Sequence, residues 1–115
     1  MWEIILSETF KAWMESLDEG SYDAIVAKIG LVRVVGPNLG KPHVDTIKGS
    51  HYRNMKELRA QYKKHVYRVF FVFDPKRNAV LLIGGDKRGD LRFYQTMIAQ
   101  ADRIYGEYLQ KERLA

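Results

Sequence analysis

Four side chains in the second half of the chain could together bind and cleave a phosphate ester. Arg68 interrupts the apolar run HVYRVFFVF. Lys87 and Arg88 lie in the glycine-rich segment GGDKRGD, and Tyr94 follows six residues after Arg88. Guanidinium and ammonium groups neutralise phosphate, while a phenol can stack on a base or donate a proton. Because burying an unpaired guanidinium is costly, we expect Arg68 to have a partner or to reach solvent.

The glycine-rich segment is not a nucleotide-binding P-loop, because it lacks the GxxxxGK[ST] order and follows a predicted antiparallel strand. Its simplest role is a flexible turn between a strand and a helix. Lys87 and Arg88 nevertheless precede a predicted helix N-terminus, where backbone dipoles and cations together favour an anion. Tyr94 falls in the first turn of that helix. It is either a core tyrosine or a ring that faces the same anion site.

These residue types suit the cleavage of RNA without a metal. The 2′-hydroxyl of RNA can attack the adjacent phosphate, so a protein has only to align the groups, neutralise the phosphorane and move two protons. Arginine supplies the neutralising charge but is a poor acid or base. Lysine, tyrosine and histidine can carry the protons. We therefore predict five catalytic residues: Arg68, Arg88, Tyr94, Lys87 and His51.

Other chemistries fit the sequence poorly. There is no cysteine, which excludes a thiolate nucleophile, a disulfide and a thiolate zinc site. The four serines lack the sharp turn that exposes a catalytic serine. His43, His51 and His65 are separated by 8 and 14 residues, without the helical spacing of metal ligands. We expect no metal and no cofactor.

Residues 36–54 are predicted to form a long ordered loop, because they contain three glycines, two prolines and two asparagines. The second half of this loop contains basic and aromatic residues suited to backbone contacts and base stacking: Lys48, His51, Tyr52 and Arg53. From this loop and the strand after it, we predict four RNA-binding residues: Lys48, Arg53, Lys56 and Arg59. An ion pair with Glu57 or Asp86 is an equally good role for Arg59.

Charge is distributed unevenly along the chain. Residues 1–45 contain 4 Lys and Arg against 7 Asp and Glu, whereas residues 46–115 contain 15 against 7. A basic half of this kind indicates an anionic partner or a solvated lysine-rich surface. The absence of cysteine fits a reducing compartment, and no apolar run approaches the roughly 20 residues that span a bilayer. We expect a cytoplasmic protein without a membrane partner.

Apolar spacing predicts an α+β protein that forms one domain, residues 1–115. A short strand at 2–6 is followed by two helices, the first capped by Ser7 and reaching Asp18, the second capped by Ser21 and ending at Gly36. Three antiparallel strands follow at 56–62, 65–73 and 79–85, and the middle one is apolar on both faces and therefore central. A last helix follows Asp90 as its N-cap. The predicted order is βααβββα.

Three blocks of this chain resemble the RelE/ParE superfamily of bacterial toxins, and more closely its phage-related HigB-like branch. The blocks are DTIKGSHYRNMKELR, YRVFFVFDPKRNAVLLIGGDKRG and RFYQTMIAQADRIYGEYL. The resemblance implies the RelE-like fold, in which an antiparallel twisted sheet packs against an N-terminal helical hairpin and a C-terminal helix. It also implies the toxin of a type II toxin–antitoxin pair that cleaves messenger RNA, typically on the ribosome. The implied protein partner is a cognate antitoxin, often a helix-turn-helix protein.

The resemblance also implies roles for individual residues. The strand arginine of RelE falls on Arg68, its loop lysine on Lys87 and its loop arginine on Arg88. Its helix tyrosine falls on Tyr94. Where RelE has two strand lysines, this chain has Met55 and Glu57, with Lys56 between them on the opposite face. HigB relatives use histidines and acids for proton transfer, which makes His51 and Asp90 further candidates alongside Lys56.

Two other functions are compatible with the same fold. A ParE-like toxin binds and inhibits DNA gyrase and cleaves nothing, and a catalytically silent relative would only bind an antitoxin and repress a promoter. Retention of the arginines and the tyrosine favours the nuclease, because a gyrase-binding protein has no need of that set.

Overall fold

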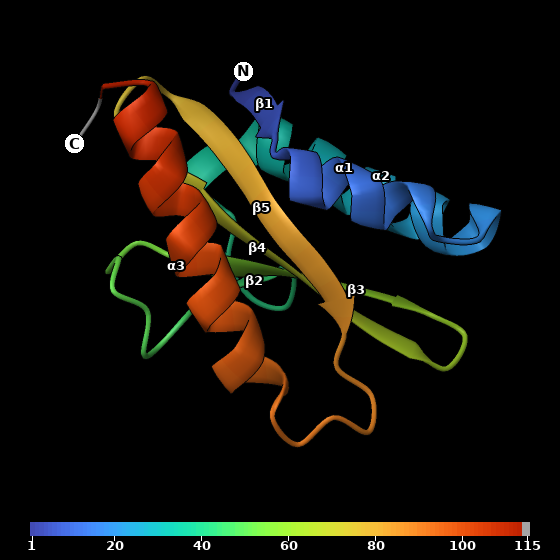
Figure 1. Ribbon diagram of the computed structural model, residues 1–115. Helices are drawn as coiled ribbons and strands as arrows, with labels where there is room; N and C mark the ends of the chain where they lie inside the picture. Colours follow the sequence, from blue (N-terminus) through green and yellow to red (C-terminus); the bar gives the residue numbers. More distant parts are fainter. Residues whose placement is uncertain (114–115) are drawn as a thin grey trace.

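The computed structural model describes residues 1–113 of the chain (Figure 1). Five strands, three α-helices and a 3₁₀ helix follow one another in the order β1 (Glu3–Leu6), α1 (Glu8–Glu15), α2 (Glu19–Val35), η1 (Gly36–Asn38), β2 (Val44–Thr46), β3 (Lys56–Tyr62), β4 (His65–Phe73), β5 (Asn78–Asp86) and α3 (Phe93–Lys111). The α+β class and the layout of helical hairpin, sheet and final helix are confirmed. No helix within residues 1–113 is both long enough and apolar enough to cross a membrane.

The five strands form one sheet in the order β1-β5-β4-β3-β2. β3, β4 and β5 are antiparallel to one another, as predicted. β2, a strand that was not predicted, is antiparallel to β3, and β1 pairs in parallel with β5. The predicted bounds 56–62 and 65–73 are those of β3 and β4. β4 lies at the centre of the sheet, and its residues alternate between the two faces with apolar side chains on both.

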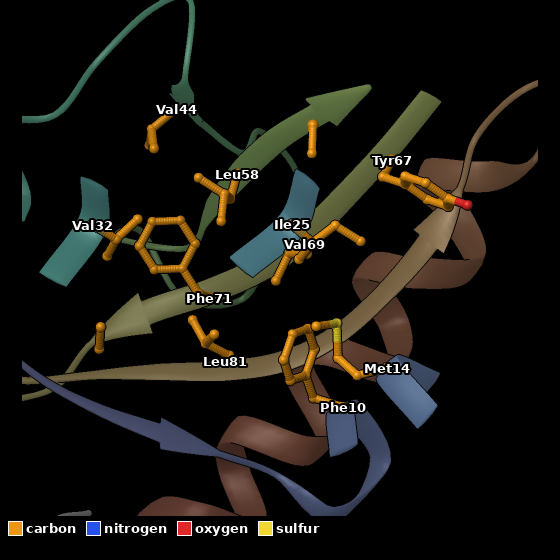
Figure 2. Close-up of a cluster of buried hydrophobic side chains, with 12 residues drawn as sticks. Phe10, Met14, Ile25, Val32, Val44, Leu58, Tyr67, Val69, Phe71 and Leu81 are labelled. Atoms are coloured by element: carbon orange, nitrogen blue, oxygen red, sulfur yellow. The ribbon is translucent and has the colours of Figure 1, made fainter. Parts of the chain in front are cut away.

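Each face of the sheet carries its own apolar core. On one face, side chains from α1 and α2 such as Phe10, Met14 and Ile25 pack against Val69 and Phe71 of β4 (Figure 2). On the other face, α3 packs against the alternate residues of β4 and β5. Figure 1 shows the helical hairpin and α3 on opposite sides of β5. The molecule therefore has three layers, and residues of even and odd number on β4 face different helices.

The N-cap of α1 was predicted correctly, whereas that of α2 was not. The Ser7 hydroxyl accepts from the Phe10 amide at 2.9 Å and caps α1, as predicted. The predicted Ser21 cap of α2 is wrong. The Asp18 carboxylate caps α2 by accepting from the Ser21 amide at 3.0 Å, so the first helix ends at Glu15. Ser21 is instead buried, and its hydroxyl accepts from Tyr67 at 2.8 Å.

Two further expectations need correction. The segment 36–54 is not loop throughout, since it contains η1 and the edge strand β2, which pairs with the start of β3. The order is therefore βααββββα. Asp90 was predicted to be the N-cap of the last helix, but the helix begins three residues later, at Phe93. The Asp90 carboxylate instead accepts from the Arg92 amide at 3.0 Å, in a turn before the helix. The connection that carries the basic glycine-rich segment is longer than predicted as a result.

Candidate active site

The candidate active site lies on the face of the sheet that α3 covers, at the end where α3 begins. Strand alternation places Glu57 and Arg59 of β3 on this face, since Leu58 and Ala60 belong to the core on the other face. Arg68 of β4 is the direct register partner of Arg59. Figure 1 shows the loop from β5 to α3 extending beyond the end of β5 on the side away from the N-terminus. This loop delivers the remaining polar groups.

A buried carboxylate organises the site. Glu57 is only 4% exposed, and its side chain is surrounded by three donors. The Tyr94 hydroxyl donates to its Oε1 at 2.6 Å, and Arg59 lies 3.0 Å from its Oε2. Arg68 Nε lies 3.5 Å from Oε1. The carboxylate thus holds two guanidiniums and a phenol within one cluster, and the alternative ion pair of Arg59 with Glu57 is confirmed.

Arg68 is held in the cluster with part of its hydrogen-bonding capacity unused. Its side chain is 12% exposed, and its Nη1 donates to the Tyr67 carbonyl at 3.0 Å. Its Nε is close enough to Glu57 for an ion pair, but the geometry does not make a hydrogen bond, and no other described residue accepts from that atom. The expectation that Arg68 would have a partner is therefore confirmed.

Tyr94 lies in the first turn of α3 and faces this cluster, with its ring against Phe70 of the core. Burial and the hydrogen bond to Glu57 raise the pKa of its hydroxyl above the ordinary 10.0. The phenol is therefore protonated near neutral pH. Lys87 Nζ lies 5.5 Å from the centre of the Tyr94 ring, within the range of a cation–π contact. The two roles considered for Tyr94 are therefore compatible, since its ring packs on the core and its hydroxyl faces the Glu57 cluster.

Asp86 fixes the start of the basic loop. Its Oδ1 accepts from the Val66 and Arg88 amides, both at 3.1 Å, and its Oδ2 lies 2.7 Å from His65 Nδ1. The Lys87 amide donates to the Val66 carbonyl at 2.9 Å, which ties the loop to β4. The Arg88 side chain is exposed beside these contacts. The loop therefore has a fixed base and presents Arg88 to solvent.

We expect Asp86→Asn to lower the free energy of unfolding by about 1–3 kcal/mol at pH 7, because a partly buried carboxylate that accepts three hydrogen bonds is replaced by a neutral amide with one acceptor oxygen. Burial alone would raise the pKa of Asp86, but hydrogen bonds from His65, Val66 and Arg88 outweigh it and hold the pKa below 3.8. A lowered folded-state pKa gives stability that is present above about pH 3.8 and lost as the pH falls through the folded value.

Urea unfolding of both proteins at neutral and acid pH measures this effect. The difference between wild type and Asp86→Asn should shrink below about pH 3.8. Asp23→Asn, on the exposed side of α2, is the control and should change stability by no more than about 0.5 kcal/mol. A difference for Asp86→Asn that is the same at both pH values would contradict the assignment.

The other predicted site residues do not join the cluster. His51 is exposed, and its amide donates to the Asp102 carboxylate at 2.9 Å, eight residues along α3 from Tyr94. Its ring contacts Tyr52. Eight helical residues correspond to about 12 Å, so the structure does not bring His51 to the tyrosine. Lys48 and Arg53 are exposed on the same loop as His51. Lys56 lies on the opposite face of β3, with Leu58.

Sequence reasoning missed the central role of Glu57 and the contribution of Asp45. The Asp45 carboxylate lies 3.1 Å from Arg59, so this arginine bridges two acids on neighbouring strands. Strand parity could have placed Glu57 on the face of Arg59, because the two are separated by one residue. Asp45 gave no such signal, because it lies on β2, within a segment whose glycines and prolines predicted a loop.

The chain matches the family model described as "Phage derived protein Gp49-like" over residues 12–106. Two relatives come from Mycobacterium tuberculosis. "Putative toxin HigB3" is 37% identical over 110 residues, which cover 95% of each chain. "Putative toxin HigB2" is 41% identical over 105 residues, which cover 89% of this chain and 52% of the relative. The chain thus spans about half the length of HigB2 and nearly all of HigB3.

Two solved structures with the same fold are those of RelE toxins. RelE in the archaeal RelE–RelB complex from Pyrococcus horikoshii has a TM-score of 0.56 at 15% identity, with 76% of this chain and 97% of that chain covered. The isolated Escherichia coli RelE toxin has a TM-score of 0.53 at 12% identity, with 84% and 96% covered. These similarities show a common fold. The chain belongs to the phage-derived Gp49-like family and is built on the fold of the RelE toxins.

Proposed function

We propose that this protein is the toxin of a toxin–antitoxin pair and that it cleaves messenger RNA, bound on the ribosome, without a metal. The observation that carries the proposal is the gathering of Arg68 and Tyr94 around the Glu57 carboxylate, with Lys87 lying against the Tyr94 ring. Relatives that are 37% and 41% identical to this chain over the matched residues carry the names of HigB toxins, which supports the toxin part. A site on the ribosome places the activity in the cytoplasm.

In the proposed reaction the 2′-oxygen of one nucleotide forms a bond to the adjacent phosphorus as the bond to the 5′-oxygen breaks. One proton leaves the 2′-hydroxyl and one reaches the departing 5′-oxygen. Arg68 and Arg88 stabilise the negative charge that develops on the phosphorane oxygens, with Arg68 already held in a nearly buried position. Lys87 positions the phosphate and, as an ammonium group, can also carry a proton.

Tyr94 is assigned the role of a neutral donor and stacking group. Its pKa is raised, so it does not serve as a base near neutral pH. Its ring packs edge-on against the buried Phe70 and Phe93, which hold it in place, and its partly exposed side can stack on a base. The hydrogen bond to Glu57 fixes the orientation of the ring before RNA binds. This arrangement supports alignment of the nucleotide beside Arg68 and Lys87.

We expect Arg88→Ala to lower cleavage about tenfold, because the exposed guanidinium is screened by solvent and supplies less stabilisation than a buried one. Primer extension on messenger RNA after induced expression measures the effect, with wild type showing defined stops that the variant weakens. Arg77→Ala, in the turn between β4 and β5 at the opposite end of the sheet, is the control and should cleave like wild type.

The same experiment tests the proposed function against gyrase inhibition. Toxicity that leaves messenger RNA intact and induces a DNA-damage response would refute the nuclease. Toxicity that persists unchanged in the combined Arg68→Ala and Arg88→Ala variant would refute it as well.

The proposed protein partner is an antitoxin, a small helix-turn-helix protein. The archaeal RelE structure is that of a complex with RelB, which supports a partner of this kind. Expression of the neighbouring small open reading frame together with this chain should restore growth if its product is the antitoxin. Growth arrest that persists in the presence of every neighbouring product would contradict the assignment.

A further inference from the structure

A pocket of about 220 Å³ opens at the outer edge of β3, next to the candidate active site. Its wall combines residues from α2, the loop before β2 and the hairpin of β3 and β4: Lys28, Pro42, Arg59, Ala60, Gln61, Val66 and Arg68. Arg59 and Arg68 thus face both the Glu57 cluster and this pocket. The third cation, Lys28, comes from the helical hairpin on the other face of the sheet.

The pocket exists because β2 covers only part of β3. β2 pairs with Lys56 to Leu58, and the last bond on this side runs from the Arg59 amide to the His43 carbonyl at 2.8 Å. Backbone groups of a strand alternate in direction, so the amide of Gln61 also points toward this edge. No described strand pairs with Gln61 there. The pocket therefore offers a backbone donor in addition to its side chains.

The charges that line the pocket favour an anion. Within residues 1–113, three cations and no carboxylate line the wall. Glu57 and Asp45, which lie outside it, both pair with Arg59, and Glu57 also pairs with Arg68. Lys28 has no carboxylate partner among the described residues. Its Nζ lies 2.8 Å from His43 Nδ1, so the ammonium group donates to the ring nitrogen and is held at the mouth of the pocket.

We propose that this pocket binds a phosphate of the RNA strand next to the phosphate that is cleaved, and that Lys28 is a ligand of that phosphate. The proposal rests on the proposed function. Because the pocket shares Arg59 and Arg68 with the candidate active site, both sites are filled at once only by a ligand with successive phosphates, as in a nucleic-acid strand. The strand would then run from Tyr94 around the open edge of β3 to α2.

Lys28 lies in the acidic part of the sequence, where neither charge nor any motif indicates an RNA contact. Only the fold brings it to the two arginines. The test therefore concerns a residue outside the predicted site, and its loss should weaken binding without removing any group of the Glu57 cluster.

Salt dependence measures contacts with phosphate directly. Each phosphate contact to a single strand contributes about 0.7 to the slope of log binding constant against log salt. Lys28→Ala should therefore reduce that slope by about 0.7 and weaken binding about fourfold near 0.15 M salt. Fluorescence anisotropy gives the binding constants, with a labelled single-stranded RNA whose 2′-hydroxyls are methylated so that it cannot be cleaved.

Two variants make the result specific. Lys28→Arg keeps the charge and should retain the slope of wild type. Lys76→Ala removes a lysine from the turn at the far end of the sheet and should leave the slope unchanged. Thermal unfolding of Lys28→Ala shows whether the variant is folded, and the retained slope of Lys28→Arg excludes a general effect of substitution at this position.

The outcomes separate this proposal from the proposed function. An unchanged slope for folded Lys28→Ala, an equal loss in Lys76→Ala, or no salt-dependent binding by wild type would each overturn the phosphate pocket. A reduced slope in Lys28→Ala supports it even if wild type fails to cleave RNA, in which case the nuclease reaction alone is refuted.

Discussion

Replacing Arg68 by alanine is expected to slow RNA cleavage by about 10²–10³-fold, the usual loss when one preorganised donor to a transition-state oxyanion is removed. Arg68 is 12% exposed and shares the Glu57 carboxylate with Arg59 and Tyr94. Its guanidinium is therefore in place before the substrate arrives. A charge fixed in a partly dry site stabilises the phosphorane more than a mobile surface cation does.

Cleavage should be measured under single-turnover conditions on ribosomes that carry messenger RNA, so that product release does not mask the chemical step. Arg68→Lys keeps the positive charge but loses the planar fork of donors, and we expect it to recover only part of the rate. Arg103→Ala, which removes an exposed arginine paired with Glu107 on α3, is the matched control. Wild-type cleavage by folded Arg68→Ala would remove Arg68 from the mechanism.

The strands of this fold could be predicted because their sequence pattern and their surroundings agree. β4 is apolar at consecutive positions, and the structure covers it on both faces, by the hairpin of α1 and α2 and by α3. Arg68 stands out in that strand because it is the one charge among apolar neighbours. The pattern therefore indicated both the strand and an arginine that needs a partner, which the structure supplies in Glu57.

Chain connections that depend on distant contacts could not be predicted in the same way. β2 is three residues long and is a strand only because the start of β3 pairs with it. The start of α3 is set by a turn in which Asp90 binds a nearby amide, a choice that short polar side chains offer at many loop positions. The parallel pairing of β1 with β5 likewise joins segments more than seventy residues apart.

In the candidate site, too, features set by the local sequence pattern could be predicted, whereas distant contacts could not. Lys87 and Tyr94 could be predicted from residue type and from their place before and within a helix, and the structure brings them within a cation–π distance. His51 shared that chemistry but is drawn away by Asp102 of α3, a contact across fifty residues. Lys28 reaches the site only because α2 crosses the edge of the sheet. The sequence therefore indicates which side chains could take part in the site, whereas the packing of the three layers determines which of them lie close together.

Glu57→Gln is expected to lower the free energy of unfolding by about 3 kcal/mol, because removing one partner of a buried ion pair leaves the other uncompensated. Glutamine has nearly the same size and can still accept from the Tyr94 hydroxyl, so the change removes mainly charge. Arg59 keeps Asp45 as a partner. Arg68, nearly buried, loses its only ion pair among the described residues and carries most of the cost.

Asp45→Asn provides the matched control for this prediction. Asp45 and Glu57 both pair with Arg59, but the Asp45 side chain is 35% exposed and that of Glu57 is 5% exposed. Exposed ion pairs contribute about 0–1 kcal/mol, so Asp45→Asn should be nearly neutral where Glu57→Gln is not. Equal losses from the two variants in urea unfolding would show that burial of Glu57 does not set the strength of the cluster.

A double variant distinguishes charge balance from packing. Glu57→Gln combined with Arg68→Gln removes both members of the pair, and we expect it to be less destabilised than the sum of the single changes, by about 1–3 kcal/mol of coupling. Additive losses would mean that Arg68 and Glu57 do not interact across their 3.5 Å separation. If they are coupled, Glu57 holds in the free protein the guanidinium that we propose to bind the substrate phosphate, and so links the stability of the fold to the proposed function.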